Sequence, residues 1–300
     1  MSRKFWWGQR GERRKVHWIR WDDLCRHKNQ GWMGFKDLTM FNEAMLAKLA
    51  WRLLHDDNSI FYRIFKARFF PTGTILEAKE LASASYAWKS ILKGHEVILK
   101  GALWRVGDGQ HIRIWGDNWL PLKGKAKVTS PWILGQVNTS VATLINESTR
   151  SWQSDVIDHV FEPAEATIIK GIPLCSFSQK DKLIWPFTPS VQYSVKSGYC
   201  FLYEGSAPVQ ASANDSLFSK KIWGLEANKV KNFVWRVCKE ALPTKENLYC
   251  RKIAQDALCE NCKERNKDGL HSIFFCSNGQ VMQRSDLQWS WLFALEGHNL

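Results

Sequence analysis

The sequence has no apolar run approaching the ~20 residues needed to cross a bilayer. No apolar segment follows the basic stretch at residues 1–18, so we expect no secretory signal. These absences predict an intracellular protein, in the nucleus or the cytoplasm, with no membrane partner. Thiols stay reduced inside cells, and the eight cysteines therefore need an explanation other than disulfides.

The sequence also lacks the residue sets of familiar catalytic centres. A polymerase palm needs an aromatic-x-Asp-Asp hairpin and a further Asp to hold two metal ions. The Asp pairs at residues 22–23 and 56–57 have no aromatic residue two positions earlier. No phosphate loop, Ser-His-Asp set or His-Glu-x-x-His motif is present. We therefore expect no catalytic residues and no enzyme activity of the chain's own.

Acidic residues are too few to balance the basic ones. The chain has 29 Asp and Glu against 42 Lys and Arg, a net charge of +13 and a pI near 9.4. This excess favours polyanionic partners, and nucleic acid is the first candidate. In the first 36 residues, tryptophans interleave with the Arg and Lys side chains.

The predicted fold class is α+β and mainly helical. Apolar spacing and capping residues predict helices at 41–54 (capped by Thr39), 59–69, 86–100, 152–161, 163–170, 196–203, 229–240 and 245–251. Two β-hairpins are predicted in the middle part, one pairing 103–106 with 112–115 and one pairing 182–187 with 192–195. The predicted parts are a basic arm with helices at 1–70, a connecting α+β region at 71–205, a linker at 206–216 and a small zinc-stapled helical domain at 217–300.

The cysteines cluster near residue 260 in a pattern that favours zinc. Cys259 and Cys262 form a CxxC pair, and His271 and Cys276 follow within the next 14 residues. Thiolate and imidazole are the ligands that tetrahedral zinc prefers, and four protein ligands make a closed, structural site. A redox CxxC pair would leave His271 and Cys276 without a role. Cys250 is an alternative ligand with poorer spacing.

The segment around this cluster resembles a known family. Residues 222–276 hold a Trp-containing segment, a helix, an Ala-Leu-Pro-Thr stretch, a second helix and then the Cys-Cys-His-Cys pattern. In that order they resemble the reverse-transcriptase zinc-binding domain of plant LINE-type (non-LTR) retroelements. The resemblance implies that Cys259, Cys262, His271 and Cys276 are the zinc ligands.

The resemblance extends over most of the chain. Residues 16–35 and 41–54 resemble the region after the polymerase palm and thumb, and 104–121 and 181–199 resemble the connecting region before the zinc domain. One departure lies in the second predicted hairpin, where Ser190-Val191 replaces the Asn-Gly-like pair that is usual in the family. Val resists the positive φ that such a turn requires, so we expect strain in this loop.

Together these observations predict a non-catalytic, nucleic-acid-binding fragment of a retrotransposon reverse transcriptase polyprotein. RNA or DNA, bound without strong sequence preference, and the missing polymerase portion of the polyprotein are the expected partners. The expected nucleic-acid contacts are Arg13, Arg14, Lys15, Lys229, Lys231, Arg251, Lys252, Lys263, Phe274 and Phe275. The two phenylalanines could stack on bases or pack inside the zinc knuckle. The alternatives are an inactive remnant, a protein-interaction module, or part of an RNA-directed DNA polymerase.

Overall fold

The chain forms two compact units in a computed structural model. The structure describes residues 2–8, 11, 15–80, 84–122, 124, 126–131, 139–175, 177, 179–206 and 213–276. One unit comprises residues 38–208, and the other combines residues 1–37 with residues 209–300. This division differs from the predicted domain boundaries, because the first 37 residues group with residues 209–300 and not with the helices that follow them.

The fold is mainly helical with short antiparallel strand pairs, which confirms the predicted class. The elements of the 38–208 unit are α3 (Leu38–His55), α4 (Ile60–Phe69), η2 (Ile75–Glu77), α5 (Tyr86–Gly101), β1 (Leu103–Arg105), η3 (Val141–Leu144), β2 (Ile145–Asn146), β3 (Ser151–Trp152), α6 (Ser154–Val160), α7 (Pro163–Lys170), β4 (Lys182–Ile184) and α8 (Val195–Ser206). No helix of the described residues is long and apolar enough to span a membrane.

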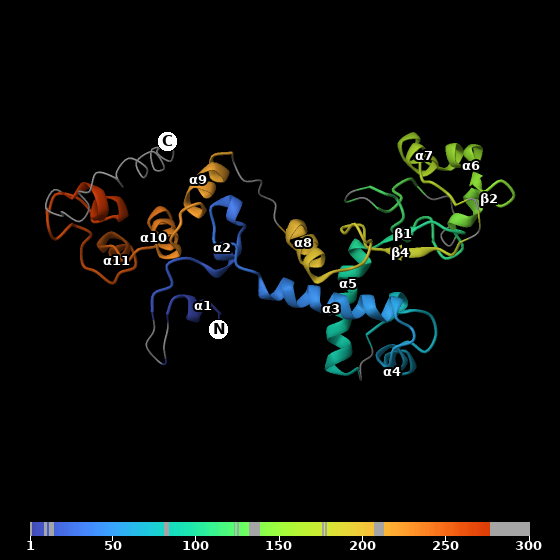
Figure 1. The fold of residues 1–300 in the computed structure, drawn as a ribbon, viewed down its shortest axis with the longest axis horizontal. Helices are drawn as coiled ribbons and strands as arrows, with labels where there is room; N and C mark the ends of the chain where they lie inside the picture. The colour runs from blue at the N-terminus through green and yellow to red at the C-terminus, as the bar shows by residue number, and fades with distance from the viewer. Residues whose placement is uncertain are drawn as a thin grey trace. The chain divides into compact units, whose positions relative to one another are not determined.

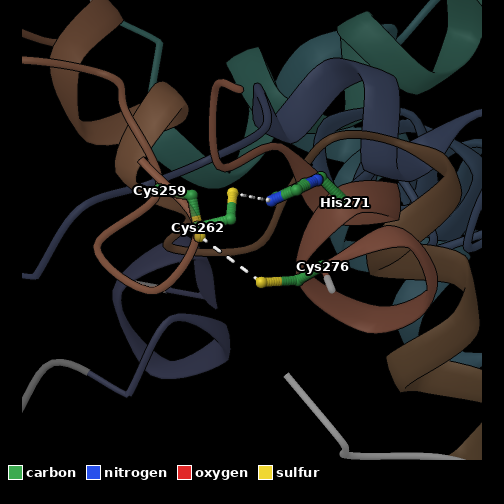
Figure 2. A group of neighbouring side chains, drawn as sticks. All are labelled: Cys259, Cys262, His271 and Cys276. Carbon is green, nitrogen blue, oxygen red and sulfur yellow. Dashed lines mark hydrogen bonds between the residues drawn. The ribbon is translucent and has the colours of Figure 1, made fainter. Parts of the chain in front are cut away.

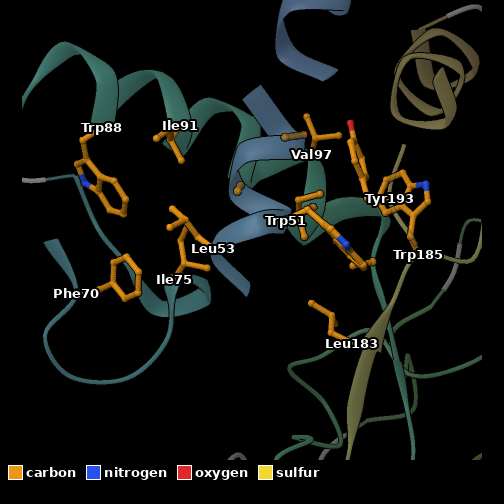
Figure 3. Packing of buried hydrophobic residues seen from close by; sticks show 14 residues of the cluster. Trp51, Leu53, Phe70, Ile75, Trp88, Ile91, Val97, Leu183, Trp185 and Tyr193 are labelled. Carbon is orange, nitrogen blue, oxygen red and sulfur yellow. The ribbon is translucent and has the colours of Figure 1, made fainter. Parts of the chain in front are cut away.

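The first core of this unit forms where α3, α5 and α8 pack together (Figure 3). Trp51 from α3, Trp88 from α5 and Trp185 after β4 are almost fully buried in it. Gly94 permits the close approach of α5 to α3, since a side chain there would collide with the backbone of Leu46 and Ala47. Each buried Trp removes a large apolar area from water, so these rings dominate the stability of the cluster.

The helix predictions hold with small changes at the ends. Ser59 caps α4 by accepting a hydrogen bond from the Tyr62 N–H (3.2 Å), and Ser85 caps α5 through the Trp88 N–H (3.3 Å). The prediction that Thr39 caps the first long helix was wrong, because α3 already begins at Leu38. Residues 213–216 of the predicted linker belong to helix α9 (Ala213–Trp223).

The predicted pairing of the two hairpins was also wrong. Strand β1 pairs with β4, with Leu103 opposite Ile184, and Figure 1 shows the two arrows side by side. The residue range 112–115 forms no strand, and α8 begins at Val195 inside the second predicted hairpin. A local hairpin does exist, but it joins β2 to β3.

Asp181 explains why the Gly107-Asp108-Gly109 turn does not form a hairpin. Its carboxylate accepts the backbone N–H groups of Gly107 (2.8 Å), Gly109 (2.9 Å) and His111 (2.9 Å). These three bonds tie the turn to the residue that precedes β4, and they place β1 beside β4. A carboxylate that satisfies several backbone donors stabilises a turn that lacks a strand partner.

The second unit contains α1 (Ser2–Trp6), α2 (Trp21–Cys25), η1 (Lys28–Gln30), α9, α10 (Asn228–Cys238), α11 (Lys245–Cys250) and the π-helical turn η4 (His271–Phe275). Its core joins both ends of the chain, since Leu24 and Met33 pack with Ile222, Val234 and Trp235. The indole N–H of Trp235 donates to the Gly31 carbonyl at 2.9 Å in a fully buried hydrogen bond. The N-terminal segment is therefore part of the same framework as residues 209–300.

Candidate metal centre

The first pair of cysteines lies on a tight loop between residues 257 and 267. The Cys259 N–H donates to the Arg265 carbonyl (2.8 Å), and the Lys267 N–H donates to the Ala257 carbonyl (2.9 Å). The Lys263 N–H closes the turn on the Cys259 carbonyl (2.8 Å). Lys263 adopts a φ of 58°, the left-handed conformation that lets the chain reverse directly after the second cysteine.

The second pair of side chains comes from η4 and the residue that follows it. The Asp268 carboxylate accepts the His271 N–H at 2.5 Å and so fixes the start of this turn. The Cys276 N–H donates to the His271 carbonyl at 3.0 Å, which brings Cys276 back beside the histidine. All four side chains point toward one another, as Figure 2 shows.

The four potential ligand atoms have the spacing of a tetrahedral metal site. They all lie within 4.8 Å of one another. The Cys259 and Cys276 sulfurs are 3.7 Å apart, and the Cys262 sulfur is 3.3 Å from Nε2 of His271. A tetrahedron with zinc–ligand bonds of about 2.0–2.3 Å has edges of roughly 3.3–3.8 Å. The donor set and its dimensions therefore fit zinc.

The electrostatic surroundings favour a thiolate at Cys259. Its side chain is almost fully buried, and the backbone N–H of Cys262 is the main cause that lowers its pKa to about 6. A thiolate is the form that binds metal. The other ring nitrogen of His271, Nδ1, is buried and has no hydrogen-bond partner among the described residues. Nε2 is therefore the histidine atom that faces the cysteines.

The structure separates these four residues from the other cysteines. Cys250 is exposed at the end of α11 and is not part of the group, so it is not the alternative ligand that its sequence position allowed. Among the described residues, one other set could hold a metal: Asp108, His111 and Asp181. The Asp181 carboxylate of that set already holds three backbone N–H groups, which accounts for its position.

Comparisons with known proteins agree with this centre. Residues 193–281 match the family described as zinc-binding in reverse transcriptase. The chain is also 38% identical, over 118 residues that cover 77% of the relative, to an uncharacterized mitochondrial protein of Arabidopsis thaliana. The chain belongs to the plant retroelement reverse-transcriptase family. The predicted resemblance to a plant retroelement reverse transcriptase is thereby confirmed.

A second, longer relative matches a larger part of the chain. The protein named "Putative ribonuclease H protein At1g65750" from Arabidopsis thaliana is 29% identical over 282 residues, which is 92% of this chain. The chain spans 45% of that relative's length. No solved structure matches the chain.

The structure describes only some of the residues predicted to contact nucleic acid. Arg13, Arg14 and the side chain of Phe274 lie outside the described residues. Lys15, Lys229, Arg251, Lys252 and Lys263 are exposed, Lys231 is half-buried, and Phe275 is 59% exposed. Arg251 lies 5.0 Å from the centre of the Trp18 ring, and its guanidinium donates to the Trp18 carbonyl at 2.9 Å.

Sequence reasoning missed a group of cation–tryptophan contacts in the same unit. Lys28 lies 5.0 Å from the centre of the Trp223 ring, and Arg26 and Lys239 lie 5.4 and 4.5 Å from that of Trp32. The interleaved Trp, Arg and Lys residues of the first 36 positions were a visible signal. Trp223 in α9 and Lys239 after α10 are about two hundred residues from their partners, so these two pairs could not be read from the sequence.

Proposed function

We propose that the unit that carries the metal centre binds single-stranded RNA or DNA, and that the chain is a non-catalytic part of a retroelement reverse transcriptase. In this proposal, zinc bound to Cys259, Cys262, His271 and Cys276 holds the 257–276 segment folded. The binding is electrostatic and largely independent of sequence. The proposed partner within the polyprotein is the polymerase portion that this chain does not include.

The concentration of positive charge in this unit is the observation that supports nucleic-acid binding. Residues 1–37 and 209–300 hold 23 Lys and Arg against 14 Asp and Glu, so they carry +9 of the chain's +13. Residues 38–208 carry the remaining +4 over a longer stretch. Lys229, Lys252 and Lys263 are exposed and form no ion pair with any described residue. Such lysines are available to phosphate groups.

A structural role for zinc follows from the closed ligand set. A catalytic zinc keeps one position for water or substrate, whereas four protein ligands leave none. Among the side chains of residues 257–276 that the structure describes, Cys259 and His271 are buried. Metal binding would therefore supply much of the free energy that folds this segment.

The proposal that the chain lacks catalysis depends on its sequence. It contains no aromatic-x-Asp-Asp motif with which a polymerase palm binds metal ions. Incubation with a primed RNA template, deoxynucleotides and Mg²⁺ or Mn²⁺ tests this directly. We expect no primer extension. Extension that occurs with the metal ion and is abolished by a chelator would contradict the proposal.

A second candidate function is packing against the polymerase portion. On α10, Val230 and Phe233 are 39% and 44% exposed and lie one helical turn apart. Exposed apolar side chains of this kind can mark a protein contact. Under this alternative, the isolated chain would bind nucleic acid no better than other basic proteins of the same charge.

Binding of labelled single-stranded RNA tests the proposed function. We expect the dissociation constant to rise by at least tenfold between about 50 and about 200 mM salt. We also expect binding to weaken after zinc chelation and in Cys259→Ser. The control is Cys250→Ser, which changes an exposed cysteine of the same unit outside the centre. Binding that is absent at low salt, or that is indifferent to zinc, would contradict the proposal.

A further inference from the structure

The unit that holds the metal centre presents two half-exposed tryptophans with cations over their rings. Trp32 and Trp223 are both partly exposed, and Arg26, Lys28 and Lys239 lie within 4.5–5.4 Å of their ring centres. These five residues are called the Trp32–Trp223 patch below. They come from both ends of the chain, so the patch exists only in the folded unit.

Short-range contacts hold the two halves of the patch together. The Ser219 hydroxyl on α9 donates to the Lys28 carbonyl on η1, which fixes Lys28 beside Trp223. Trp235 anchors the neighbouring Gly31 carbonyl, and its ring packs edge-on to Trp32 at 6.5 Å. Because Trp32 directly follows Gly31, its backbone is held while its ring stays partly exposed. These contacts therefore fix where the two rings lie within the unit.

The chemistry of the patch matches a single-stranded polynucleotide. Proteins that bind single strands combine cations along the backbone with aromatic rings on which bases stack. Arg26 is already paired with Asp23 at 3.0 Å, whereas Lys28 forms no ion pair with any described residue. Lys28 is therefore the cation that a phosphate can engage with the least rearrangement. Trp32 and Trp223 supply the aromatic rings, and a base that stacks on them would take the place of the cations that now lie over them.

We propose that the Trp32–Trp223 patch is the base-stacking surface on which this unit holds a single-stranded nucleic acid. The proposal depends on the proposed function and adds the place of contact. It assigns recognition of the nucleic acid to the surface formed by η1, Trp32 and the end of α9. It does not assign recognition to the residues around the metal centre. Zinc then acts by keeping the unit folded.

A comparison of two probes with the same phosphates separates stacking from charge. One probe is an oligothymidylate of about 20 nucleotides, and the other is an abasic oligonucleotide of the same length. Stacking on tryptophan predicts that the full-length protein binds oligothymidylate about tenfold or more tightly than the abasic strand. Trp223→Ala should lose most of this preference for oligothymidylate, whereas Trp223→Phe should keep most of it.

Substitution of Lys28 tests the contribution of charge separately from that of stacking. Lys28→Gln should weaken both probes equally and lower the slope of log affinity against log salt by about 1. Tyr86→Ala is the matched control, because Tyr86 is an aromatic side chain that is 88% exposed in the other unit. It should change neither probe. Zinc content, measured for every variant, confirms that the unit remains folded.

The outcomes distinguish this inference from the proposed function. Equal affinity for the two probes, or a preference that survives in Trp32→Ala and Trp223→Ala, overturns the stacking surface but leaves salt-dependent binding intact. No binding of either probe at low salt overturns both. Photo-cross-linking of the wild-type protein to iodouracil-containing strands avoids any folding defect. Cross-links at Trp32 or Trp223 support the inference, and cross-links confined to other residues contradict it.

Discussion

The Glu165 carboxylate accepts both the backbone N–H (3.0 Å) and the hydroxyl (2.5 Å) of Ser130. Its other oxygen accepts the corresponding two groups of Thr129, at 2.7 and 2.6 Å. Glu165 is 8% exposed and lies on α7, so these four bonds attach the 129–130 segment to a helix. A buried carboxylate with four donors is a fully satisfied polar site.

Replacement of this carboxylate should destabilise the 38–208 unit. In Glu165→Gln, the amide N–H₂ would face two of the donors that now reach an oxygen, so we expect a loss of about 2 kcal/mol in the free energy of unfolding. Urea denaturation followed by tryptophan fluorescence measures it. Glu147→Gln, at an exposed position of the same unit, should change the stability by less than about 0.5 kcal/mol. Equal effects of the two changes would refute the assigned role.

The same group predicts a pH dependence. Burial raises the pKa of Glu165, but the hydrogen bonds from Ser130 and Thr129 outweigh it and hold the pKa below its ordinary value. A carboxyl group whose pKa is lower in the folded state stabilises the fold above its unfolded value, about 4.3. That stability is lost as the pH falls through the folded-state pKa. The difference between wild type and Glu165→Gln should therefore shrink on acidification, and a constant difference would contradict this account.

Val191 has a left-handed backbone conformation with a φ of 51°, as the departure from the family's turn suggested. A β-branched side chain is strained there, whereas Asn tolerates this region. We expect Val191→Asn to raise the free energy of unfolding by about 1 kcal/mol. Val156→Asn, in the regular helix α6, serves as the control and should not stabilise the protein. A lower melting temperature for Val191→Asn would show that the Val side chain contributes more by packing than it costs in strain.

The metal centre predicts a sharp contrast between two cysteines of one unit. We expect the wild-type protein to bind one equivalent of zinc and Cys259→Ser to bind much less. Cys259→Ser should also make residues 257–276 sensitive to proteolysis. Cys250→Ser, which changes an exposed thiol outside the tetrahedron, should retain full zinc. Metal analysis by mass spectrometry and limited proteolysis with and without chelator measure both effects. Equal zinc loss in the two variants would mean that the ligand set is wrong.

Substitution of Trp235 tests whether the N-terminal segment belongs to the unit that holds the candidate metal centre. Trp235→Phe removes the bond to the Gly31 carbonyl and leaves a void, at a cost of about 2–3 kcal/mol. Amide hydrogen exchange should accelerate in residues 15–37 as well as around α10. Trp88→Phe is the control, since Trp88 is equally buried but its indole N–H has no hydrogen-bond partner among the described residues. Unchanged exchange in residues 15–37 would argue against the composite unit.

The amino-acid sequence by itself determined the features that depend on near neighbours. The four candidate metal ligands lie within 18 residues, and CxxC spacing places two thiols on one turn whatever surrounds it. The caps at Ser59 and Ser85 act on the first turn of their own helices. The strain at Val191 was foreseeable for the same reason, because it arises within a single residue.

Only the tertiary structure decided the pairings between distant residues. Leu103 and Ile184 are opposite each other because three N–H groups of the 107–111 turn bind Asp181, and no local pattern specifies that partner. Gly31 and Trp235 are 204 residues apart, yet their hydrogen bond joins the basic N-terminal segment to the unit that holds the candidate metal centre. Such contacts depend on which apolar surfaces exclude water together, and a linear pattern shows that a surface is apolar without showing what covers it.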